Sequence, residues 1–165
     1  MVERDALSVR RARRRVGARV GAWLAAALLV TGCGAILESP PEPTPADFPG
    51  IAGELASRGL DLGDIASGDA GCDDSTLIPT AIGFDASGLG QAEPIRLRVY
   101  IFRNGDAYDR RRPDVDACVA AWATDPGTVE MIDARPFVLA GQGPWPAEFK
   151  DAVREAMAAA AGAGG

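Results

Sequence analysis

The sequence predicts a small α+β domain with an antiparallel or mixed sheet of about four strands and helices packed on one face. Segments in which apolar and polar residues alternate, as in strands, are interspersed with segments whose apolar residues recur every three or four positions, as in helices. The order is helix, strand, strand, helix, strand, strand, helix, which is typical of α+β domains. A length of 165 residues, 47% of them hydrophobic, suits a single core.

Composition divides the chain into four parts. Residues 1–32 form an arginine-rich leader with an apolar run, and residues 33–50 contain five prolines, which predict an extended tether rather than part of a core. The folded domain is expected over residues 51–160. A glycine and alanine tail, residues 161–165, is expected to be flexible.

The first half of the domain contains one helix and two strands. Helical spacing of apolar residues predicts a helix over 51–60, and the glycines and aspartates of 61–74 predict a surface loop. Residues 76–85, interrupted by a proline, predict either a strand near an edge of the sheet or an irregular lead-in to one. The clearest strand is 95–102, in which Ile, Leu, Val and Ile alternate with Arg, Arg, Tyr and Phe. One face of this strand is therefore expected to be apolar and buried, and the other partly exposed to solvent.

The second half contains two helices around a hairpin. Pro113 suits the first position of a helix over 113–124, with apolar residues repeating at three, four and seven positions. Residues 128–132 and 136–140 predict a hairpin. Pro146 predicts the start of the last helix, in which apolar residues recur every fourth position.

The leader carries the most specific motif in the chain. After its arginines, the apolar run 20–32 spans thirteen residues, fewer than the roughly 20 that cross a bilayer. The run ends in Val30-Thr31-Gly32-Cys33, which resembles the lipobox of bacterial lipoprotein signal peptides. The resemblance implies cleavage after Gly32, diacylglycerol and palmitate-type acylation at Cys33, and anchoring to the outer side of a bacterial membrane. The alternative is an uncleaved signal anchor or a chance cysteine in an apolar helix.

Two cysteines remain if Cys33 carries lipid. Cys72 and Cys118 are then an even pair in an exported, oxidising compartment, which predicts a disulfide between them. The alternative is a buried free Cys118 on the apolar face of its helix and a separate Cys72 in the loop.

Several chemistries are excluded by composition. The chain has no histidine, which excludes Ser-His-Asp and Cys-His nucleophile systems and imidazole metal sites, and we predict no cofactor. It also lacks a Cys-x-x-Cys motif and a phosphate-binding glycine loop. Without the leader, ten basic and 21 acidic side chains give a net charge of about −11. An acidic body is a poor partner for nucleic acid, which we exclude.

Three features leave function open. The aspartates of 61–74 do not have the spacing of a helix-loop-helix calcium site, and a solvated loop is the simpler interpretation. Arg110-Arg111-Arg112 suits either an anionic partner or a charge-balanced helix. Trp145, between two prolines, suits contact with a protein or glycan partner, or packing of the last helix. We predict a non-catalytic binding or accessory module of the envelope. The alternatives are an envelope hydrolase or metal-dependent enzyme that uses carboxylates and, after it, a structural spacer protein.

Overall fold

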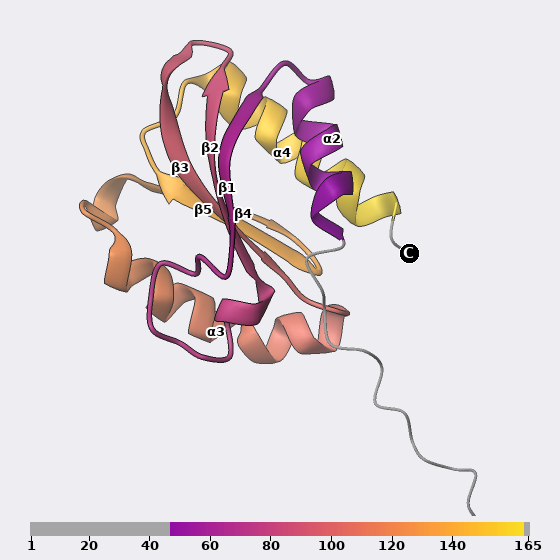
Figure 1. Ribbon diagram of the computed structural model, residues 1–165, viewed down its shortest axis with the longest axis vertical. Coiled ribbons are helices and arrows are strands. Elements are labelled where there is room, and N and C mark those ends of the chain that lie inside the picture. The colour runs from indigo at the N-terminus through magenta and orange to yellow at the C-terminus, as the bar shows by residue number, and fades with distance from the viewer. Residues whose placement is uncertain (1–46, 164–165) are drawn as a thin grey trace, which may run out of the picture. The chain divides into compact units, whose positions relative to one another are not determined.

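The computed structural model describes residues 47–163 (Figure 1). The predicted leader, its lipobox-like segment and Cys33 lie outside the described residues. The helices are α2 (Phe48–Ser57), α3 (Gly105–Trp122) and α4 (Ala147–Ala163), and the strands are β1 (Asp61–Ser67), β2 (Ala81–Gly88), β3 (Gln91–Ile101), β4 (Val129–Ala134) and β5 (Phe137–Gln142). Short 3-10 turns occupy Ile78–Thr80 and Pro126–Thr128.

The strands form one antiparallel sheet in the order β1-β2-β3-β5-β4. This confirms the α+β class and the predicted hairpin, which is formed by β4 and β5. The sheet has one strand more than predicted, because β1 occupies residues 61–67 of the expected loop. Glycine and aspartate disfavour strands, but β1 is an edge strand with a register shift between Gly63 and Ala66, where pairing with β2 outweighs weak propensity.

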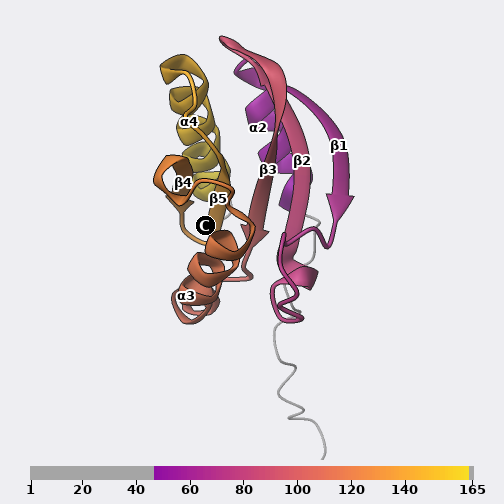
Figure 2. The same cartoon turned by 90° about the vertical axis from the view of Figure 1, so that its left-hand side faces the viewer.

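The helices cover both faces of the sheet, so the prediction that they gather on one face is wrong (Figure 2). On one face, Leu97, Val99 and Ile101 of β3 belong to a core with α2 and α4. On the other, Tyr100 belongs to a second core with α3. The cause is visible in β5, whose first five residues are all buried and therefore need cover on both sides.

The bounds of the helices also differ from those predicted. α3 begins at Gly105 rather than at Pro113, because Asn104 caps it by accepting a hydrogen bond from the amide of Ala107 at 2.9 Å. Pro113 therefore lies inside the helix. α2 begins within the predicted tether, with Phe48 buried, and α4 continues to Ala163, into the expected tail.

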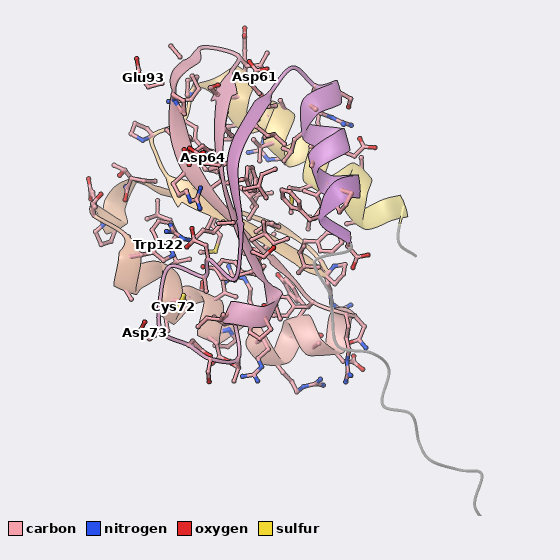
Figure 3. All side chains as sticks on the ribbon, in the orientation of Figure 1. Asp61, Asp64, Cys72, Asp73, Glu93 and Trp122 are labelled. Atoms are coloured by element: carbon pink, nitrogen blue, oxygen red, sulfur yellow. A yellow bond between two sulfur atoms is a disulfide. The ribbon has the colours of Figure 1, made fainter. Side chains whose placement is uncertain are left out.

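The predicted disulfide is confirmed. Cys72 is bonded to Cys118 of α3, with 5.5 Å between their Cα atoms, and Figure 3 shows Cys72 beside α3. Nearby, the Tyr100 hydroxyl donates a hydrogen bond to the carbonyl of Ala70 at 2.8 Å. The connection between β1 and β2 is thus fastened to α3 covalently and to the sheet by a buried hydrogen bond.

Candidate functional site

The aspartates of residues 61–74 do not converge on a metal site. Figure 3 places Asp61 and Asp64 along β1 and Asp73 in the loop beside α3, well apart in the view. Within residues 47–163, no group of three or more Cys, Asp or Glu side chains is arranged to hold a metal ion.

Asp69 belongs instead to an ion-paired cluster on the α3 face of the sheet. Its carboxylate accepts hydrogen bonds from Arg96 at 2.7 and 3.0 Å and from Arg98 at 3.0 Å. Arg98 also stacks on the ring of Trp122, 4.8 Å from the centroid. Burial alone would raise the pKa of Asp69, but the two arginines outweigh it and hold that pKa below its usual value.

Arg112 belongs to a second ion-paired cluster, between α3 and β4. It donates hydrogen bonds to both carboxylate oxygens of Asp133, at 2.6 and 3.1 Å, and pairs with Asp116. Tyr108 also donates to Asp133 at 2.7 Å. The hydrogen bond from Arg112 lowers the pKa of Asp133, and burial raises the pKa of Tyr108. For Arg112, the charge-balanced interpretation of the arginine run is the better one.

The other two arginines of the run line a recess between α3 and the 3-10 turn, which we call the basic recess. Its volume is about 430 Å³. Its lining residues are Ser75, Thr76, Pro79, Thr80, Phe102, Arg103, Ala107, Arg110 and Arg111. Three arginines, three hydroxyl side chains and three apolar residues therefore meet at one place, although they come from two segments more than 20 residues apart.

The wall opposite α3 is held by Asp74. Its carboxylate accepts hydrogen bonds from the amide and hydroxyl of Thr76 at 2.8 and 2.6 Å, and from the amide of Leu77 at 3.2 Å. These hydrogen bonds, those of Thr76 above all, lower the pKa of Asp74, with a smaller contribution from the charge of Arg111. Thr80 donates to the carbonyl of Leu77 at 2.9 Å, so this wall has a defined shape.

Two polar side chains of the basic recess have no partner in the part of the chain that the structure describes. Arg110 makes no ion pair and Ser75 no hydrogen bond, whereas Arg111 pairs with Asp114 at 3.0 Å. Both unpartnered side chains are exposed. A guanidinium and a hydroxyl that are available to a ligand are the features that recognise an anionic group.

Trp145 does not contribute an exposed ring. It is 7% exposed, packs edge-on against Phe149 with 5.6 Å between the ring centroids, and donates from its indole nitrogen to the carbonyl of Gln142 at 3.0 Å. This burial favours its interpretation as a packing residue of the last helix over contact with a partner.

A further recess, of about 410 Å³, lies beside Trp122 and is lined by Arg98 and Gln142. Its polar groups are committed internally. Arg98 is bonded to Asp69, and the Gln142 side chain accepts from Thr124 at 3.0 Å and donates to the carbonyl of Asp125 at 2.9 Å. It therefore offers a ligand fewer available donors than the basic recess does.

Sequence reasoning identified only part of the basic recess. It singled out Arg110 and Arg111 as members of a basic run but missed Ser75, Phe102 and Arg103. The predicted alternation of residues 95–102 placed Phe102 on the face of the sheet that α3 covers, where the basic recess lies. No local pattern in the sequence, however, indicates that residues 75–80 lie opposite α3.

Comparison of the chain with models of protein families, with characterised proteins and with solved structures gave no match. In residues 47–163, none of the helices has both the length and the apolar character needed to cross a bilayer.

Proposed function

We propose that this chain is an exported bacterial lipoprotein, acylated at Cys33 and held at the outer side of a membrane, whose domain is a non-catalytic binding or accessory module of the cell envelope. Two observations support export. The lipobox-like segment Val30-Thr31-Gly32-Cys33 provides the lipidation motif. The disulfide between Cys72 and Cys118 suits an oxidising compartment and uses the other two cysteines of the chain.

The basic recess is the observation that carries the binding function. It combines available donors at Arg110 and Ser75 with an apolar surface. By contrast, Arg96, Arg98 and Arg112 are paired with carboxylates. Asp69, Asp74 and Asp133 all have a lowered pKa, so none of these three carboxyls has the raised pKa that a general acid needs.

The anchoring is tested by expressing the full chain in a bacterial host in the presence of a clickable palmitate analogue. We expect label on the wild-type chain and recovery in the membrane fraction, and neither for Cys33→Ser, because the serine hydroxyl does not form the thioether. The matched control is Cys72→Ser, which removes a cysteine but keeps the lipobox and so retains the label. A wild-type chain without label, or label that persists in Cys33→Ser, would contradict the proposal.

The binding function is tested by capture from intact envelope, with the lipidated chain as bait and Cys33→Ser as the unanchored form. We expect envelope components that are retained by the wild-type chain and lost on substitution of Arg110. An identical set of components with and without Arg110 would argue against the basic recess as the site.

A further inference from the structure

The electrostatic setting of the basic recess restricts the size of its ligand. Residues 47–163 carry ten basic and nineteen acidic side chains, a net charge of −9. Three of the ten basic side chains, Arg103, Arg110 and Arg111, line this single recess. Extended polyanions and anionic bilayers would also meet the acidic remainder of the surface, which repels them over about a Debye length. A compact anionic group escapes that repulsion.

The donors of the basic recess suit a single anionic head group. Arg110 has no partner among the described residues, so it can bind an anion without first giving up a carboxylate. Arg111 follows Arg110 in α3 and forms an ion pair with Asp114. The hydroxyl of Ser75 lies on the opposite wall of the recess. Hydrogen bonds from charged donors are stronger than those between neutral groups, so these donors can orient a small ligand.

The apolar part of the basic recess indicates that the ligand has more than a head group. Phe102 belongs to the lining but is only 3% exposed, so Pro79 and Ala107 supply the apolar surface that is open to a ligand beside the arginines. A volume of about 430 Å³ lies in the range of pockets for small organic molecules and exceeds what one phosphate ion fills. An inorganic anion would leave these apolar walls in water, whereas an attached apolar group would cover them.

We infer that the basic recess binds a small organic anion, in which a carboxylate or phosphate contacts Arg110 and Arg111 and an attached apolar group contacts Pro79 and Ala107. The inference rests on the proposed binding function and deepens it by naming the class of ligand. Carboxylate and phosphate share the chemistry that the recess recognises, and the experiment below distinguishes them.

The experiment measures dissociation constants by ligand-observed NMR, with the full lipidated chain in a non-ionic detergent. The four test ligands are phenylacetate, phenyl phosphate, the neutral phenylacetamide and inorganic phosphate. We expect at least one of the two aromatic anions to bind at least tenfold more tightly than both phenylacetamide and inorganic phosphate. The tighter of the two then identifies the head group.

The variants locate the binding. Arg110→Gln should weaken binding of the preferred aromatic anion about tenfold. The variant should keep its fold, because Arg110 has no partner among the described residues to lose. The matched control is Arg154→Gln on α4, an exposed arginine outside the recess that pairs with Asp151 at 2.6 Å, and it should bind as the wild-type chain does.

Three results would overturn the inference: no binding of either aromatic anion, equal binding of phenylacetamide or inorganic phosphate, or equal binding by Arg110→Gln and the wild-type chain. Each is separable from failure of the proposed anchoring. Palmitate labelling reports on Cys33 and does not depend on the recess, and anion binding is measured in detergent whether or not the chain is acylated.

Discussion

Gly71 is a residue at which a single added methyl group would clash with side chains on the α3 face. Its backbone has φ of +79°, a conformation that residues with a side chain rarely adopt. A Cβ atom there would lie 2.5 Å from Cδ1 of Trp122 and 2.6 Å from Nε of Arg98. The glycine therefore permits the loop to approach the stacked pair, one residue from the disulfide at Cys72.

Gly71→Ala should lower the free energy of unfolding by about 1–3 kcal/mol, because the backbone is strained and the Arg98–Trp122 pair must move. Urea denaturation followed by tryptophan fluorescence measures it. The matched control is Gly53→Ala, at an exposed position of α2 with nothing within 4 Å of the added Cβ, which should stabilise the chain by about 0.5–1 kcal/mol. Equal effects of the two substitutions would show that the close approach of Gly71 is not a constraint.

At the scale of elements, α3 carries the largest difference between the predicted and the observed structure. The N-cap at Asn104 lets the helix begin eight residues before Pro113, and these added turns carry Tyr108, Arg110 and Arg111. Without them the basic recess would lack one of its walls. A proline within the helix has no amide hydrogen to donate to the carbonyl of Asp109.

Pro113→Ala should therefore raise the free energy of unfolding, by about 1–2 kcal/mol, since alanine restores the donor at an exposed position of α3. Thermal unfolding followed by circular dichroism measures the change. Pro126→Ala is the control: Pro126 is in the first turn of a 3-10 helix, where no donor is missing, and it should give no such gain. A Pro113→Ala chain that unfolds at a lower temperature would show that the proline fits α3 without cost.

At the scale of the whole molecule, ion pairs connect the sheet to the β1–β2 connection and to α3. Asp69 joins the β1–β2 connection to β3, and Asp133 joins β4 to α3. Both carboxyls have a lowered pKa in the folded state. Such a group contributes stability above the pKa of the unfolded chain, about 3.9 for aspartate, and that contribution is lost as the pH falls through the folded pKa.

The free energy of unfolding should accordingly fall as the pH is lowered below about 4. Asp69→Asn should lower the free energy of unfolding by about 1–2 kcal/mol at pH 7. In this variant the free energy of unfolding should also fall less on acidification than in the wild-type chain, because asparagine does not titrate. Urea denaturation at pH 7, 5, 4 and 3 measures both effects. Asp151→Asn, which removes an exposed pair with Arg154, is the control and should leave the pH dependence unchanged. A pH dependence of Asp69→Asn identical to that of the wild-type chain would contradict the assignment.

Local pattern predicted much of the fold correctly. The alternation in residues 95–102 placed Leu97, Val99 and Tyr100 on the faces that they occupy, and turn residues located the β4–β5 hairpin. The same reasoning failed for β1, where the strand depends on a neighbouring edge rather than on its own residues. It also failed for the face that α3 covers, because alternation in one strand does not say what packs over either side.

By itself, the sequence determined the α+β class and the exclusion of histidine chemistry, and it predicted the pairing of Cys72 with Cys118 on the expectation that Cys33 carries lipid. These follow from residue identity, number and short-range periodicity. Only the tertiary structure decided that α3 lies opposite α2 and α4, that Arg112 is committed to Asp133, and that Arg110 meets Ser75 at one recess. The physical reason is that packing and ion pairing join segments far apart in the chain, and no local pattern specifies which distant residue completes a pair.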